Sequence, residues 1–110
     1  MPVRMAKRHK YGAKAVTIDG IRFASKKEGK RYAELKLLAK SGEISELQRQ
    51  VPFRYELDGE LMFTYVADFT YLDKLEGLTI IEDVKGVKTP LYRLKKKLIE
   101  AEYNIEIMEI

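Results

Sequence analysis

Three charged residues at the ends of two apolar segments have the types and spacing of a hydrolytic site. Asp68 lies inside the apolar segment 65–69, and Asp83 and Lys85 close the apolar segment 78–85. Residues two apart in a strand face the same side, so Asp83 and Lys85 are expected to share a face. Carboxylates and an ammonium gathered at a strand end are costly unless a divalent cation neutralises them. This arrangement suits metal-assisted hydrolysis of a phosphodiester.

Three further polar side chains are candidates for this site, Glu28 as a third carboxylate and Glu82 and Gln50 in supporting roles. Glu82 is an odd number of positions from Lys85, so it is expected to face the other side of the sheet and to support the site at most indirectly. Glu28 follows Ser25 by three positions, as in a helical capping box, and either caps the helix or adds a third carboxylate. Gln50 belongs to the preceding expected strand, where it either orients a water or a ligand or is a plain surface residue.

The elements that must position these residues are indicated by turn and cap signals. Asp-Gly pairs at 19–20 and 58–59 predict tight hairpin turns, and Ser25 and Thr89-Pro90 predict the starts of two helices. The expected elements are strands at 16–18 and 21–23, a helix at 25–41, strands at 44–57 (broken near Pro52), 61–71 and 78–84, a helix at 89–104 and a strand at 105–110. In the second helix, Leu91, Leu94, Leu98 and Ala101 are expected to form the apolar stripe. The order predicts an α/β fold with a mixed sheet: a short β-hairpin followed by an αβββαβ core.

Basic charge is concentrated in two blocks of the chain. The net charge is +4, but residues 1–14 carry five bases and no acid, and residues 85–97 carry six bases and no acid. Such segregation favours a polyanionic partner, the alternative being a solvated helix face and a terminal tail. The expected phosphate-contacting residues are Arg4, Lys7, Arg8, Lys10, Lys14, Lys88, Arg93, Lys96 and Lys97.

Length and composition limit the remaining choices. A chain of 110 residues is expected to form one domain, here 11–110, preceded by a flexible basic arm at 1–10. No apolar run approaches the roughly 20 residues of a membrane span, so no membrane association is expected. The chain has no cysteine, which excludes a disulfide framework and makes a cytoplasmic setting the default expectation.

Together these residues resemble the PD-(D/E)XK nuclease superfamily. Its restriction-endonuclease-like αβββαβ core carries an acid on one strand, an acid-X-Lys triplet on the next and often a glutamate on the first helix. Asp68, the triplet at 83–85 and Glu28 match these positions, and the resemblance covers roughly residues 11–110. The segments Phe-Ala-Ser-Lys-Lys-Glu, Tyr-Val-Ala-Asp-Phe and Glu-Asp-Val-Lys-Gly look like a phage-encoded branch described as Holliday junction resolvase-like. One departure is Ala67, where the superfamily pattern has proline.

The resemblance implies an Mg²⁺-dependent endodeoxyribonuclease, with Mn²⁺ able to substitute, that leaves 5′-phosphate and 3′-hydroxyl ends. Asp68, Asp83, Glu28 and the Val84 carbonyl would hold the metal. Lys85 would position or help deprotonate the attacking water, or stabilise charge on the phosphorane. The implied partner is branched DNA, cut by a twofold homodimer in phage recombination or replication, within the cytoplasm of a bacterial host. The alternatives are a structure- or end-specific DNase without junction preference, a non-catalytic DNA-binding accessory protein, and a small RNA-associated protein.

Overall fold

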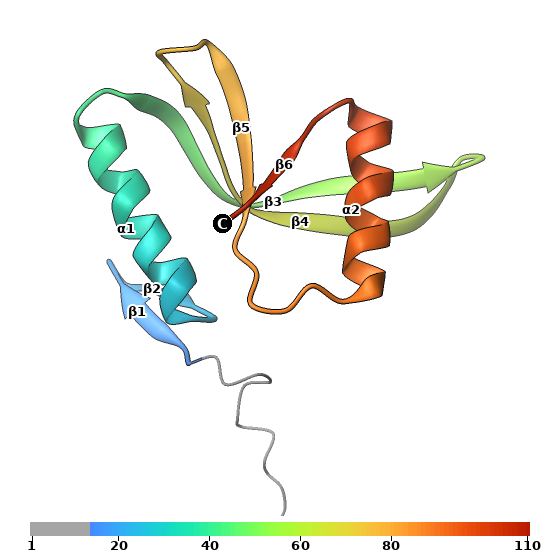
Figure 1. The fold of residues 1–110 in the computed structure, drawn as a ribbon, viewed down its shortest axis with the longest axis horizontal. Helices are drawn as coiled ribbons and strands as arrows, with labels where there is room; N and C mark the ends of the chain where they lie inside the picture. Colours follow the sequence, from blue (N-terminus) through green and yellow to red (C-terminus); the bar gives the residue numbers. More distant parts are fainter. Residues whose placement is uncertain (1–13) are drawn as a thin grey trace, which may run out of the picture.

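A four-stranded mixed sheet between two helices forms the centre of the protein. The computed structural model describes residues 14–110, with elements in the order β1 (Val16–Ile18), β2 (Ile21–Phe23), α1 (Lys26–Lys40), β3 (Ile44–Leu57), β4 (Glu60–Asp73), β5 (Leu78–Asp83), α2 (Pro90–Tyr103) and β6 (Ile107–Glu109). The central sheet has the order β3-β4-β5-β6, and β1 and β2 form a separate hairpin beside α1 (Figure 1). Its strands are antiparallel except for β5 and β6, which α2 joins as a parallel crossover. The predicted mixed α/β architecture and element order are confirmed.

The turn and cap signals act as the sequence indicates. Asp19 and Asp58 have φ angles of 54° and 53°, and the glycine after each also has a positive φ, as two-residue hairpin turns require. The Ser25 hydroxyl accepts a hydrogen bond from the Glu28 amide at 3.1 Å and so caps α1. Thr89 caps α2 in the same way, with Pro90 in the first turn. Within residues 14–110, no helix is long and apolar enough to cross a membrane.

The predicted break of β3 near Pro52 is wrong. Pro52 pairs in register with Val66, and the irregularities of the β3–β4 ladder lie elsewhere, between Ser45 and Gln48 and between Tyr55 and Glu56. β3 is an edge strand of the central sheet, and an edge strand tolerates a proline, which has no amide hydrogen to donate. β3 therefore runs unbroken to its end at Leu57.

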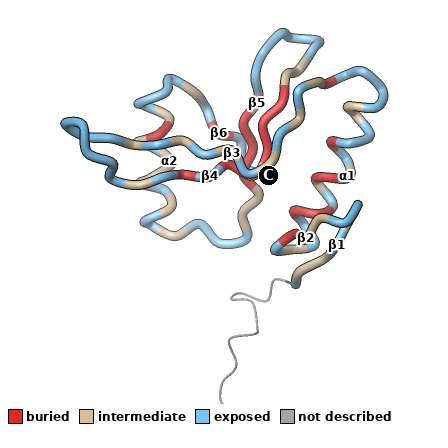
Figure 2. The backbone as a smooth tube through the Cα atoms, turned by 180° about the vertical axis from the view of Figure 1, so that it is seen from behind, coloured by how far each residue is buried: buried red, intermediate tan, exposed pale blue. Residues whose placement is uncertain are grey.

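The β3–β4 hairpin changes helix partner in its middle. Tyr65 and Ala67 belong to the core under α2, whereas Phe69 and Tyr71 belong to the core under α1, although simple strand alternation would place all four on one side of β4. Figure 1 shows the hairpin bending there and continuing beyond β5 toward α2, and Figure 2 shows buried stretches along β4 and β5 at the centre. Asp68 therefore stands where the two cores meet.

The predicted apolar stripe of α2 is not the face that packs on the sheet. Leu91 and Leu94 are 59% and 53% exposed and Ala101 is also exposed, while Leu98 is half-buried. The sheet instead buries Ile99 completely, and Tyr92, two turns earlier, packs in the same core. Hydropathy favoured the leucines, but the orientation of the helix is set by which side chains fit against the strands. The correction leaves several leucines of α2 on the surface.

Candidate functional site

The most unusual side chain in the described chain is the carboxylate of Asp83, at the end of β5. It is only 1% exposed, and its Oδ1 atom is buried without a hydrogen-bond partner. The other oxygen, Oδ2, accepts a short hydrogen bond from the Tyr65 hydroxyl and lies 3.4 Å from Lys85 Nζ. Burial, followed by the interaction with the neighbouring Asp68 carboxyl, raises the pKa of Asp83 to about 7. A half-satisfied buried carboxylate is costly and would gain from a cation.

Asp68 approaches Asp83 from the neighbouring strand β4. Its Oδ2 accepts a hydrogen bond of 2.7 Å from the Val84 amide, which anchors it to the chain directly after Asp83. Its Oδ1 accepts a hydrogen bond of 3.2 Å from Gln50 Nε2. The structure therefore brings together the two acids that the sequence singles out, and it places Lys85 on the Asp83 side as the strand alternation requires.

Gln50 links Asp68 to Glu28. Its Nε2 atom donates to Glu28 Oε2 at 3.3 Å as well as to Asp68 Oδ1, so one amide holds both acids. Gln50 has a φ of 53° inside β3, a left-handed conformation that costs a non-glycine residue about 1–3 kcal/mol. Strain of this kind persists where the surrounding structure enforces it, and here it lies beside the acids. Gln50 is exposed, as expected for a surface residue, and its amide also contacts two of the expected site acids.

Glu28 lies in the first turn of α1, where the sequence leaves open a capping role or a ligand role. Its amide is capped by Ser25, while its buried carboxylate, in the first turn of α1, accepts from Gln50. Burial, followed by the charge of Asp68, raises the pKa of Glu28. Among residues 14–110, however, no three carboxylate or imidazole side chains lie close enough to hold one ion. The three acids are therefore not a compact triad, and Glu28 reaches the others through Gln50.

Asp68 and Asp83 are the pair of carboxylates in this site that could hold a divalent cation. Mg²⁺ dehydrates reluctantly and is often held by only one or two carboxylates, with water and substrate phosphate completing its shell. Asp68 and Asp83 supply such a pair, and the unpartnered Oδ1 of Asp83 is an oxygen without another task.

Glu82 serves the other face of β5, as its spacing from Lys85 predicts. Both of its oxygens accept from Arg31 of α1, at 2.8 and 2.6 Å, and it also accepts a short hydrogen bond from Tyr71. Burial and the Glu82 carboxylate raise the pKa of Tyr71 to about 12, so this phenol stays a donor. Glu82 therefore clamps α1, and with it Glu28, against the strand that carries Asp83.

Two tyrosines complete the surroundings of Lys85. Its Nζ lies 4.7 Å from the ring centroid of Tyr92, whose ring is tilted against that of Tyr65. The Tyr92 hydroxyl donates to Glu109 of β6 at 2.8 Å. Burial raises the pKa of both phenols, so both act as hydrogen-bond donors. Sequence reasoning missed Tyr65, because nothing in the sequence separates it from an ordinary core tyrosine.

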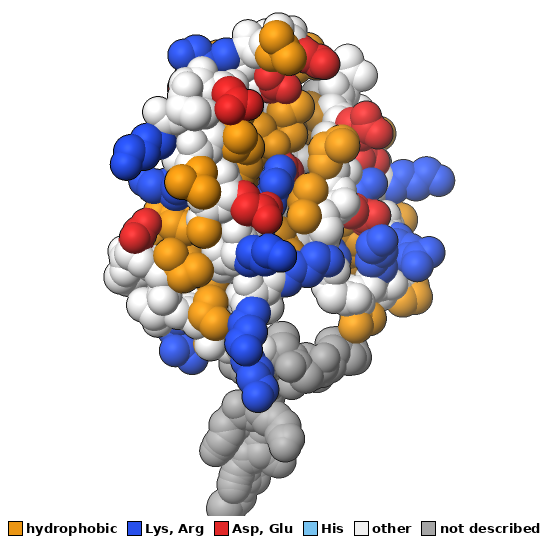
Figure 3. Space-filling model, turned by 60° about the vertical axis from the view of Figure 1, so that its left-hand side comes forward, with side chains coloured by type: hydrophobic (Ala, Val, Ile, Leu, Met, Phe, Trp, Pro, Cys, Tyr) orange, Lys and Arg blue, Asp and Glu red, His pale blue; other side chains and the backbone are white. Residues whose placement is uncertain are grey.

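The predicted phosphate-contacting residues fall into three groups. Arg4, Lys7, Arg8 and Lys10 lie outside the described residues, and Lys14 is exposed. Lys88, Arg93, Lys96 and Lys97 line one depression of about 470 Å³, together with Glu100 and Glu109. Lys88 pairs with Glu109 at 3.3 Å and Lys96 with Glu100 at 3.1 Å, so acids partly offset this block. Lys and Arg side chains also form a band across the lower half of the face in Figure 3.

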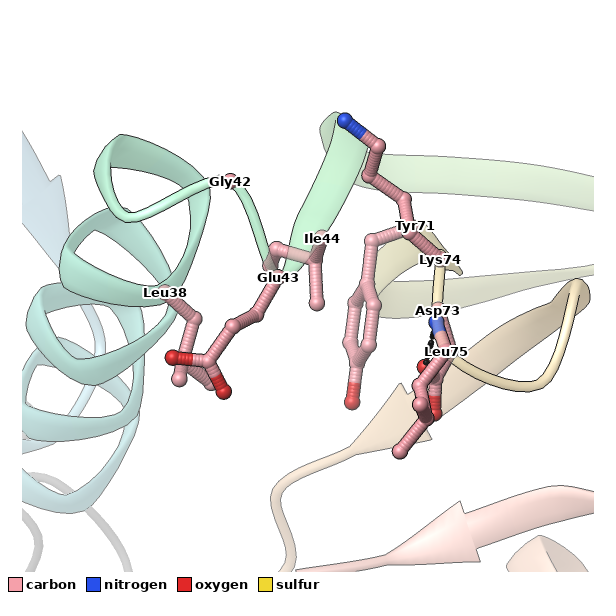
Figure 4. A pocket seen from close by; sticks show the side chains of 8 residues that line it. All are labelled: Leu38, Gly42, Glu43, Ile44, Tyr71, Asp73, Lys74 and Leu75. Carbon is pink, nitrogen blue, oxygen red and sulfur yellow. Dashed lines mark hydrogen bonds between the residues drawn. The ribbon is translucent and has the colours of Figure 1, made fainter.

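A wider cavity of about 590 Å³ lies at the other end of α1 and does not include the acidic site. Leu38, Ile44, Tyr71 and Leu75 form much of its wall, as Figure 4 shows. The Asp73 carboxylate in this cavity accepts from the Leu75 amide at 2.9 Å and so stabilises the β4–β5 turn. The cavity offers an apolar wall but no pair of adjoining acids.

The fold and this site define a mixed α/β domain with an acidic site where two strands and the first turn of a helix meet. The chain belongs to the family described as "Protein of unknown function (DUF1064)", whose family model matches residues 8–108. Neither the curated proteins nor the solved structures contain a match to the chain.

Proposed function

We propose that this protein is an Mg²⁺-dependent DNA endonuclease of the PD-(D/E)XK superfamily, from its phage-encoded Holliday junction resolvase-like branch. The observation that carries the proposal is the buried Asp83 carboxylate, with one oxygen unpartnered, beside both Asp68 and Lys85. A protein that only bound DNA would gain nothing from acids that repel phosphates. Two acids beside a lysine can, in contrast, hold a metal and position water for phosphodiester hydrolysis.

In this proposal the chain's own groups have separate tasks. Asp68, Asp83 and the Val84 carbonyl hold the metal, and Glu28 joins them through Gln50. Mg²⁺, when bound, would lower the pKa of its water and neutralise charge on the phosphate oxygens. Lys85 positions the attacking water or stabilises the negative charge that develops on the phosphate. Tyr65 keeps the Asp83 carboxylate fixed by donating to one of its oxygens.

The direct test is cleavage by the Asp83→Asn protein. We expect it to lose Mg²⁺- and Mn²⁺-dependent cleavage, because the change removes a metal ligand. Its affinity for DNA should remain, because the change removes no lysine or arginine that could contact phosphate. Asp58→Asn is the matched control, since Asp58 is exposed in a hairpin turn and asparagine tolerates the same positive φ. Unchanged cutting by Asp83→Asn would remove Asp83 from the site.

The DNA structure that is cut forms the finer part of the proposal. A panel of four-way junction, flap, duplex and single-stranded DNA separates a junction-selective enzyme from a structure- or end-specific DNase. Symmetric cutting of two strands at a junction requires a twofold dimer, which sedimentation of the protein measures. The proposed setting is phage recombination or replication in the cytoplasm of a bacterial host. Absence of metal-dependent cleavage on every DNA would favour a DNA-binding accessory protein instead.

A further inference from the structure

A small cavity opens directly beside the acidic site. Its volume is about 290 Å³, and its walls come from β4, from Lys85 and from the first turns of α2. Two of the lining residues also contact Asp83: Tyr65 donates to its carboxylate, and Lys85 lies 3.4 Å from it. We call this space the Leu91 cavity, because Leu91 forms part of its wall. A ligand bound in it would adjoin any phosphate held at the acids.

The Leu91 cavity combines exposed apolar walls with cations. Leu91 and Val66 are 59% and 43% exposed, and the threonines at 64 and 89 add hydroxyl groups. Lys85 is held over the Tyr92 ring at 4.7 Å, and Lys95 is held over the Phe63 ring at 5.3 Å. Both ammonium groups are thereby kept at the cavity instead of extending freely into solvent. An apolar surface with fixed cations around it matches a flat heterocyclic base attached to anionic phosphates.

The size of the cavity limits what can enter. Ligand cavities commonly measure about 300–1,000 Å³, so this one is at the small end and suits one nucleoside rather than a base pair. A base inside a duplex would have to be unpaired and unstacked before it could enter, which costs several kcal/mol. A base that is already unpaired at a branch, flap or single strand enters without that cost.

A protein partner fits these walls less well. The cores of protein–protein interfaces are depleted of lysine, yet two lysines line this cavity beside its apolar residues. Lys85 is also paired with Asp83, so covering the cavity with protein would bury an ammonium next to the metal site. A polyanion with a flat, partly apolar group is the better match.

We infer that the Leu91 cavity binds one unpaired nucleotide next to the scissile phosphate, and so makes the protein select DNA with an unstacked base at the cleavage position. This inference rests on the proposed function, because it assigns a substrate feature to the same site. It also gives a role to Leu91, which the sheet does not cover.

The test measures binding of the full chain in EDTA, so that no cleavage is needed. The probes are a flapped DNA, with 2-aminopurine as its first unpaired base, and the matching duplex with 2-aminopurine paired. Leu91→Gln is compared with Leu94→Gln, a control of similar exposure on the same helix that does not line the cavity. We expect Leu91→Gln to weaken flap binding about 5- to 10-fold and to remove the change in 2-aminopurine fluorescence, while duplex binding is unchanged. Leu94→Gln should leave both unchanged.

The possible results separate this inference from the proposed function. Equal effects of the two substitutions, or an equal loss of flap and duplex binding after Leu91→Gln, would overturn the nucleotide site even if the protein cleaves DNA. A Leu91-dependent loss of dimer in sedimentation would show that the cavity is a protein interface, and would also overturn it. A flap-specific loss would support the cavity even in a protein that cuts no DNA, in which case only the nuclease proposal fails.

Discussion

The metal-free protein should become more stable when Asp83 is replaced by asparagine. Asp83 carries a buried charge with one unpartnered oxygen, and it lies next to a second carboxylate, Asp68. Asparagine has nearly the same volume, can still accept the hydrogen bond from Tyr65, and can donate an N–H to Asp68. The substitution therefore removes a repulsion and keeps the packing.

The magnitude follows from the pKa of Asp83, which rises from an ordinary value of 3.8 to about 7 on folding. Between these values the folded state holds a proton that the unfolded state has released, so the free energy of unfolding falls as pH rises and is lowest above pH 7. Each pKa unit corresponds to about 1.4 kcal/mol, so the cost above pH 7 is at most about 4 kcal/mol. Because asparagine also gives up the ion pair with Lys85, we expect it to recover only about 1–3 kcal/mol at pH 8.

The assay is thermal unfolding in EDTA between pH 4.5 and 8.5, followed by circular dichroism. At pH 8 the Asp83→Asn protein should melt at least about 4 °C above the wild type, and the difference should shrink toward pH 4.5. Glu28 titrates in the same direction, so some pH dependence should remain in the variant. Added Mg²⁺ should raise the melting temperature of the wild type only, because the variant lacks the ligand.

A lower melting temperature for Asp83→Asn at pH 8 in EDTA would refute this reasoning. The contact between Lys85 and Asp83 would then be a stabilising ion pair, and the unpartnered oxygen would give no reason to expect a cation. The exposed control Asp58→Asn should change the melting temperature little at any pH.

Three other substitutions test the surroundings of the site. Gln50→Gly should relieve the left-handed strain and preserve or raise stability by about 1 kcal/mol, yet weaken Mg²⁺ binding in a calorimetric titration, since the two acids lose their shared donor. Glu82→Gln should lower the free energy of urea unfolding by about 2–4 kcal/mol, because Arg31 loses a nearly buried charged partner. Lys97→Ala should reduce the slope of log affinity for DNA against log salt by about 1, if this exposed base contacts a phosphate.

Local signals were sufficient to predict most of the fold. The Asp-Gly turns, the Ser25 cap and the Thr89 cap each depend on one or two neighbouring residues, so the sequence alone indicates them. The spacing of Asp83 and Lys85 predicted their shared side for the same reason, since strand alternation is a local property. The meeting with Asp68 required one further step, the pairing of two consecutive antiparallel strands.

Features set by tertiary packing could not be predicted in this way. The buried face of α2 depends on the strands under it, which select Ile99 over the more numerous leucines. One of the ion pairs that offset the basic block joins Lys88 to Glu109, in a strand that follows α2 in the sequence. The contacts of Gln50 depend on its left-handed φ, which the sequence does not predict because glutamine has no preference for that conformation.

The position of the acids is tied to the bend of the hairpin. A straight β4 would direct Tyr65 and Phe69 into one core, but the bend gives them different helices and leaves Asp68 at the division. Gln50, one of two residues with a left-handed φ in the adjoining strand, holds Asp68 and Glu28 at this same place. A domain selected only for stability would fill such a junction with apolar side chains, since buried acids and left-handed glutamine both cost free energy. That two independent costs coincide at one point of the sheet is the physical reason to look for function there.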